Sequence, residues 1–206
     1  SGQETIGGSI NVTTWSGEFG DNSDFNSNGR IRLGSQTSNY SSLLGTTIIT
    51  ANKNHRLKLS SLKEKANDTK FSGGTIKSTE YRRDRHDLGY GYQAGKNTLQ
   101  IDLGKNETGY SGTPALPMDV DYINAKLASI SYHFDDAYWT LSAKVYYSDI
   151  EHGMTNYLLR PAPRMSKMWR RNIAEGDNFG LKINIIINDN HGNWQLGVDS
   201  HDENHI

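Results

Sequence analysis

Apolar and polar residues alternate along most of this chain, which is the pattern of β-strands with two different faces. The alternation is clearest from Leu99 to Leu103, from Trp139 to Tyr147 and from Phe179 to Ile187. Together with weaker stretches it predicts about nine strands, near residues 29–38, 41–51, 55–66, 80–93, 98–107, 124–134, 138–150, 177–188 and 194–203. Many of these reach ten residues, above the roughly five or six usual in soluble sheets. They match the roughly 9–11 residues that cross a bilayer at a tilt.

The connections between these strands are of two kinds. Short turns are expected at 52–54, 94–97, 135–137 and 189–193, and they alternate with long links at 67–79, 108–123 and 151–176. The first link on the side of the long links, near Asn39, is an exception because it is short. Short periplasmic turns and long external loops are typical of barrels that span a membrane. The fold class we predict is therefore all-β, an antiparallel transmembrane β-barrel.

The number of strands and the aromatic residues refine this prediction. Bacterial outer-membrane barrels normally have even strand numbers, so about nine strands indicate part of a larger barrel. Phe134, Trp139 and Trp194 lie beside short turns, and Tyr147 and Phe179 mark the other end of their strands. From Trp139 to Tyr147 a tilted strand spans roughly 20 Å, close to the apolar band between aromatic girdles. The alternative is a soluble β-sandwich binding module whose core these aromatics fill.

Composition excludes several classes of protein. The 22 basic and 23 acidic residues give no electrostatic reason to expect a nucleic-acid partner. There is no cysteine, so disulfides and thiolate metal sites are excluded within these residues. The mean hydropathy of −0.72 is low, but in a spanning barrel only alternate residues face lipid. The chain has neither an initiator Met nor a signal peptide, so we expect a mature protein or a piece of a longer one.

The first residues differ from the rest. Paired glycines before a short β-prone run, in Thr5-Ile6-Gly7-Gly8-Ser9-Ile10-Asn11-Val12-Thr13-Thr14, suit a tight bend into a strand. This segment resembles the end of the plug domain of TonB-dependent receptors. The resemblance implies that residues 1–16 close the plug and link it to the barrel. Residues 17–206 would then form the N-terminal portion of the barrel.

Within that superfamily, three stretches resemble the TonB-dependent copper receptors. They are residues 108–119 (TGYSGTPALPMD), 152–160 (HGMTNYLLR) and 171–178 (RNIAEGDN). In that family a His-x-Met pair on the barrel helps to hold copper together with Cys and Met residues of the plug. The resemblance places this pair on His152 and Met154.

The same resemblance implies a function and its partners. It implies copper uptake across the outer membrane of a Gram-negative bacterium, energised through the plug by the TonB–ExbB–ExbD complex. Outer-membrane lipid, lipopolysaccharide and the metal ion would be the other partners. Copper would be cargo, with no catalytic cofactor and no enzymatic activity. Two alternatives stay open, a receptor for a siderophore or other ligand and a small outer-membrane barrel enzyme.

The residues themselves agree with a copper pair. If the strand at 138–150 continues, His152 and Met154 extend its lumen-facing side. A thioether beside an imidazole selects copper, particularly Cu(I), over hard cations. Met165 and Met168 add sulfur in the same loop and are candidates for metal capture. Alternatively, the methionines are adaptable packing and His152 is a polar rim residue.

Two further groups of polar residues have less specific interpretations. His191, His201 and His205 have no spacing typical of a metal site. The charged run at 81–87 places charge on both faces of a strand. It fits a position near lipopolysaccharide head groups, and equally an ordinary solvated strand end.

Overall fold

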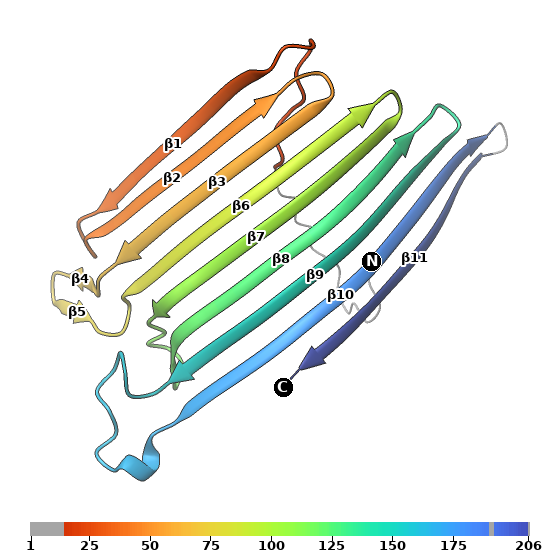
Figure 1. Ribbon diagram of the computed structural model, residues 1–206. Coiled ribbons are helices and arrows are strands. Elements are labelled where there is room, and N and C mark those ends of the chain that lie inside the picture. The colour runs from red at the N-terminus through yellow and green to blue at the C-terminus, as the bar shows by residue number, and fades with distance from the viewer. Residues whose placement is uncertain (1–14, 190–191, 206) are drawn as a thin grey trace.

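The computed structural model describes residues 15–189 and 192–205, and nine strands in these residues form one antiparallel sheet. Each strand pairs with its neighbours in the chain, so the sheet is a simple meander (Figure 1). The strands are β1 (Asn26–Gln36), β2 (Ser41–Ala51), β3 (His55–Ala66), β6 (Tyr81–Ala94), β7 (Asn97–Ser111), β8 (Asp119–Asp135), β9 (Trp139–Thr155), β10 (Arg171–Asp189) and β11 (Gly192–His205).

The links between strands are sorted by side, as predicted. A small hairpin, β4 (Thr69–Phe71) and β5 (Gly74–Ile76), and a short 3-10 helix, η1 (Ser166–Met168), belong to long links. Figure 1 shows both at one end of the sheet, with short turns at the opposite end. No helix in the described ranges is long and apolar enough to cross a membrane.

The nine predicted strands are confirmed, and those at 41–51 and 55–66 have the predicted bounds. The later strands extend further at the end that carries the long links: the strand predicted at 124–134 is Asp119–Asp135, and that at 177–188 is Arg171–Asp189. Polar residues occupy both faces of these extensions, for example Arg171, Asn172 and Glu175. Alternation is therefore lost there, although the hydrogen-bonded ladder continues.

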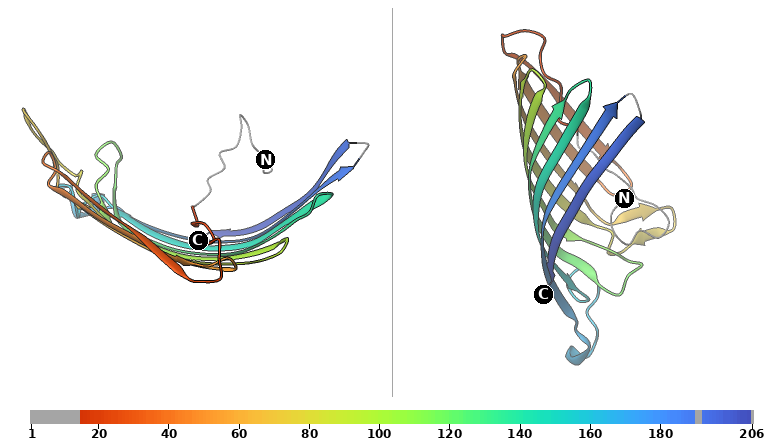
Figure 2. Two further views of the ribbon diagram at one scale, coloured as in Figure 1. Left: turned by 90° about the horizontal axis from the view of Figure 1, so that it is seen from above. Right: turned by 90° about the vertical axis from the view of Figure 1, so that its right-hand side faces the viewer.

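The sheet is curved and has no second sheet stacked on it within the described residues (Figure 2). In a β-sandwich, Leu141, Ile185 and Leu196 would be buried between two layers. Instead they lie in one row across β9, β10 and β11, and Leu196 is 62% exposed. The prediction of a β-sandwich as the alternative fold is therefore wrong.

The outer, convex face carries rows of apolar side chains. One row crosses the sheet through Ile48, Leu59, Leu88, Leu103, Ala128, Tyr147 and Phe179. We call the outer-face rows from Trp139 to Tyr147 the apolar band. Exposed aliphatic residues fill it, and Ile130, for example, is 52% exposed. Soluble monomers rarely expose a continuous apolar surface of this kind.

A charged row ends the apolar band at the side of the long links. It runs through His86, Lys105, Lys126, Asp149 and Asp177, one outer-face row beyond Leu103 and Tyr147. Side chains change from apolar in one row to mostly charged in the next row. The apolar band therefore has a sharp border on this face.

The inner, concave face is polar, and the segment before β1 lies on it (Figure 2). The Arg56 guanidinium donates to the Gly17 carbonyl oxygen at 2.8 Å and lies 4.4 Å from the centre of the Phe19 ring. The Lys58 ammonium donates to the carbonyl oxygen of Trp15. Both basic side chains come from β3, so they hold the entering segment against the sheet. Of the predicted plug segment 1–16, residues 1–14 lie outside the described residues.

Candidate functional site

His152 and Met154 lie near the end of β9, which continues to Thr155 as the copper-pair hypothesis requires. His152 is paired with Ile123 on β8 and Ala174 on β10, and Met154 with Val120 and Asn172. Both are half-buried. They have the parity of Lys144 and Ser148, which line the inner-face hollow together with Lys58 and Asp102. The structure therefore places the imidazole and the thioether on one face, at the end of the sheet with the long links.

A separate hollow of about 300 Å³ lies beside His152 on the inner face. Its walls include Ser148, Ile150, His152, Gly176, Glu203 and His205. A Cβ atom on Gly176 would lie 2.8 Å from Nδ1 of His205, so the His205 ring reaches over the glycine toward β9. His205 Nε2 lies 3.5 Å from a carboxylate oxygen of Glu203. A second imidazole and the Glu203 carboxylate thus share the hollow with His152, and Glu175 and Asp177 also border it.

Sequence reasoning did not find His205 because it considered spacing only between histidines of the same segment. The register of the strands pairs His205 with Gly176, and Gly176 with Ile150, two residues from His152. The signal was present in the alternation of the last strand: Trp194, Leu196 and Val198 face outward, so His201, Glu203 and His205 face inward.

The donor atoms around His152 do not form a complete metal site by themselves. In the described ranges, no group of three or more His, Cys, Asp or Glu residues has the geometry to hold a metal ion. Met154 lies one inner-face row beyond His152 and is not a wall of the hollow. The arrangement offers soft and borderline donors from one wall, and it needs donors from outside these residues.

A buried ion pair fixes the rim above this position. Asp119, at the start of β8, is 1% exposed. Arg160 binds it with both arms, Nε to Oδ2 and Nη2 to Oδ1, each at 2.7 Å. Burial acts to raise the pKa of Asp119, but hydrogen bonds from Arg160 and Thr113 outweigh it, and the pKa is lowered. The carboxylate therefore stays charged and joins the 112–118 link to the 156–170 link.

The first long link is tied to the same rim. The Ser78 hydroxyl donates to the Leu159 carbonyl oxygen at 3.2 Å, and the Gly112 amide donates to the Glu80 carbonyl oxygen at 2.8 Å. A Cβ on Gly112 would lie 2.0 Å from the Ser78 carbonyl oxygen, so only glycine permits this approach. Three long links therefore form one connected rim close to Thr155, at the end of β9.

Met165 and Met168 lie on the outside of this rim. Their exposures are 51% and 48%, and neither lines the hollow beside His152. Two contacts hold the loop that carries them: the rings of Tyr157 and Trp169 stack with their centroids 4.9 Å apart, and the side-chain amide of Asn156 donates to the Met168 carbonyl oxygen. These methionines therefore lie in the link that follows β9 and do not line the hollow beside His152.

Comparisons with known proteins give the fold. No protein-family model matches the chain, and no curated protein matches it at a significant level. Among solved structures, the chain is similar to one described as "Copper transporter OprC", with a TM-score of 0.82 and 16% sequence identity. The similarity covers 93% of this chain and 30% of that chain. The all-β, nine-stranded antiparallel sheet described above therefore matches part of the barrel of a transporter.

Proposed function

We propose that this chain is part of a TonB-dependent outer-membrane receptor that takes up copper in a Gram-negative bacterium. The observation that carries the proposal is the contrast between the two faces of one sheet. The outer face is a continuous apolar band, and the inner face holds an imidazole and a thioether below a fixed rim. A barrel wall with lipid on one side and a ligand passage on the other has this arrangement.

The metal is proposed from the chemistry of the donors. The His152 imidazole and the Met154 thioether favour copper, especially Cu(I), over Mg²⁺ or Ca²⁺, which prefer oxygen ligands. His205 offers a second imidazole, and the Glu203 carboxylate lies where it can orient that ring by accepting a hydrogen bond from its Nε2–H. Met165 and Met168, exposed on the rim, suit a first encounter with the ion. The remaining ligands would come from a plug domain.

The chain covers less than a third of the copper transporter that it resembles, so the proposed activity belongs to a longer protein. In that protein, residues 1–16 would end the plug and lead into the barrel, and residues 17–206 would be the first barrel strands. The TonB–ExbB–ExbD complex would act on the plug from the periplasm. Binding and release of an ion need no bond to be made or broken within a substrate, so no catalytic residue is proposed.

The test is copper affinity of the intact receptor with the pair removed. The double variant His152→Ala/Met154→Ala is titrated with Cu(I) under reducing conditions. Loss of a residue that merely orients a metal ligand already costs about 10–100-fold, so loss of two ligands is expected to exceed about 100-fold. His133→Ala and Met118→Leu, which alter the same residue types away from the hollow, are the controls. Unchanged affinity in the double variant would reject copper and favour a siderophore or another ligand.

A further inference from the structure

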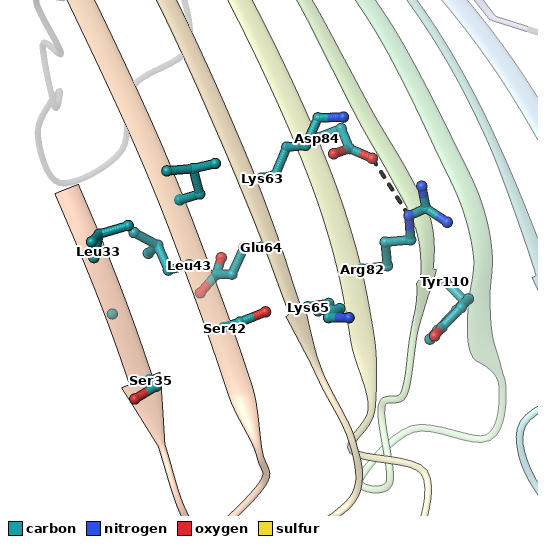
Figure 3. Close-up of a pocket in the computed structure, with 12 residues that line it drawn as sticks. Leu33, Ser35, Ser42, Leu43, Lys63, Glu64, Lys65, Arg82, Asp84 and Tyr110 are labelled. Atoms are coloured by element: carbon teal, nitrogen blue, oxygen red, sulfur yellow. Dashed lines mark ion pairs between the residues drawn. The ribbon is translucent and has the colours of Figure 1, made fainter. Parts of the chain in front are cut away.

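A second hollow, of about 870 Å³, lies on the outer face of β1, β2, β3, β6 and β7. Two neighbouring outer-face rows form its floor, one through Leu33, Leu44, Lys63 and Asp84 and the other through Ser35, Ser42, Lys65, Arg82 and Tyr110. Figure 3 shows the labelled side chains across these strands. We call this feature the Lys63 hollow.

The Lys63 hollow lies just beyond the border of the apolar band. On β3, Leu59 belongs to the band, Ser61 follows it on the same face, and Lys63 and Lys65 come next at alternate positions. On β2, Thr46 lies in the same way between Ile48 of the band and Leu44 of the hollow. A ligand bound at the charged rows of the hollow would therefore reach the band if it extends across one further row of side chains.

The charges in the hollow do not cancel. Arg82 pairs with Asp84 at 3.5 Å, whereas Lys63 and Lys65 form no ion pair with any described residue. Glu64 also borders the hollow, but it accepts a hydrogen bond from the Tyr81 hydroxyl at 3.0 Å, and alternation directs both side chains to the inner face. Among the outer-face residues that line the hollow, three cations therefore accompany a single carboxylate, that of Asp84.

The excess of positive charge is local to this part of the sheet. Further along the same face, Lys105 is paired with Glu107 at 2.8 Å and Lys126 with Asp149 at 3.1 Å. Those lysines are neutralised by their neighbours, and the lysines of β3 are not. The difference marks β3 and β6 as the place where an external anion is attracted.

Aliphatic side chains adjoin these cations. Leu33 is 76% exposed and Leu44 is 49% exposed, and Ile31, in the next outer-face row, leads from them toward Ile48 and Leu59 of the band. An anion that is only hydrophilic would leave these residues in water. The combination fits a ligand with phosphate groups at one end and hydrocarbon chains at the other.

We propose that the Lys63 hollow binds the phosphorylated, acylated sugar of lipopolysaccharide. Lys63, Lys65 and Arg82 would hold a phosphate, since ammonium and guanidinium groups are the side chains suited to it. The acyl chains would lie along Leu33 and Leu44 toward the band. The inference rests on the outer-membrane placement in the proposed function, and it is independent of copper.

The test compares two sets of cations on the same face of the intact receptor in detergent. The triple variant Lys63→Gln/Lys65→Gln/Arg82→Gln is titrated with purified lipid A, and the control is Lys105→Gln/Lys126→Gln. Each basic residue near an anionic lipid surface contributes about fivefold to binding, so the triple variant should bind about 100-fold more weakly. The control should change by less than about fivefold, because its lysines are already paired.

Two further measurements distinguish lipid A from free phosphate as the ligand. Inorganic phosphate should bind neither protein appreciably, and Leu33→Gln/Leu44→Gln should weaken lipid A binding with all charges kept. Equal losses in the triple variant and the control, unchanged lipid A affinity, or tight binding of inorganic phosphate alone would each overturn the proposal. Copper affinity is measured on the same variants and should not change. If His152→Ala/Met154→Ala binds copper as tightly as the parent protein while lipid A binding changes as expected, copper is rejected as the cargo. The lipid A site is then still supported.

Discussion

The buried pair of Asp119 and Arg160 makes a quantitative prediction about the rim. In Arg160→Ala, the Asp119 carboxylate, 1% exposed, loses two hydrogen bonds of 2.7 Å and keeps the Thr113 amide at 2.8 Å. Removal of one partner of a buried pair costs about 3–5 kcal/mol. Because Thr113 still binds the carboxylate and the Arg160 side chain is 22% exposed, we expect a cost near the lower end, about 3 kcal/mol.

The assay is reversible unfolding in urea in detergent, together with limited proteolysis of the 156–170 link. The matched control is Lys126→Ala, which breaks an ion pair whose side chains are 70% and 40% exposed. That change should cost no more than about 1 kcal/mol. If Arg160→Ala costs less than about 1 kcal/mol and the link is cleaved no faster, the pair does not stabilise the rim.

The same pair predicts a dependence on pH. Because the pKa of Asp119 is lowered in the folded protein, its stabilising contribution is complete above the unfolded pKa of about 3.9. The contribution is lost as the pH falls through the lowered folded pKa. The stability difference between the parent protein and Asp119→Asn should therefore be constant above about pH 5 and shrink in stronger acid. A difference that disappears near neutral pH would contradict this reasoning.

Two further predictions concern the rim and the hollow beside His152. Gly112→Ala forces a Cβ to within 2.0 Å of the Ser78 carbonyl oxygen, so proteolysis of the rim should accelerate, whereas unchanged cleavage would show that the contact is not tight. His205→Ala should weaken Cu(I) binding by the intact receptor about tenfold, the lower end of the range for residues that support a metal site. His201→Ala, outside the hollow, should leave the affinity unchanged, and equal effects of the two changes would remove His205 from the site.

The sheet could be predicted from the sequence where the two faces differ in polarity. β3 has the predicted bounds, and the residues around Leu59 in its first half alternate between apolar and polar. The outer ends of β8 and β10 could not be predicted, since both of their faces are polar. The β4–β5 hairpin was missed because strands of three residues carry no readable period.

The site was predictable only in part, for a reason of geometry. His152 and Met154 could be placed on one face because they belong to one strand, and the extension of β9 confirms that placement. His205 came to the hollow through the register of two other strands, which no local pattern specifies. The ion pair of Asp119 with Arg160 joins two different links. No motif around either residue predicts that the two side chains meet.

The most direct test of the account compares adjacent residues on opposite faces of β10. Ile183 lies midway along the apolar band on the outer face, and Asn184, next to it, faces inward and accepts a hydrogen bond from Gln195 at 2.9 Å. The measurement is the free energy of unfolding of Ile183→Arg and Asn184→Arg in lipid bilayers. We expect Ile183→Arg to cost about 2–4 kcal/mol, because arginine at the membrane midplane is unfavourable on the lipid face. We expect less than about 1 kcal/mol for Asn184→Arg, a change on the polar inner face. Equal losses of unfolding free energy at the two positions, or no loss for Ile183→Arg, would contradict the claim that the outer face of this sheet contacts lipid.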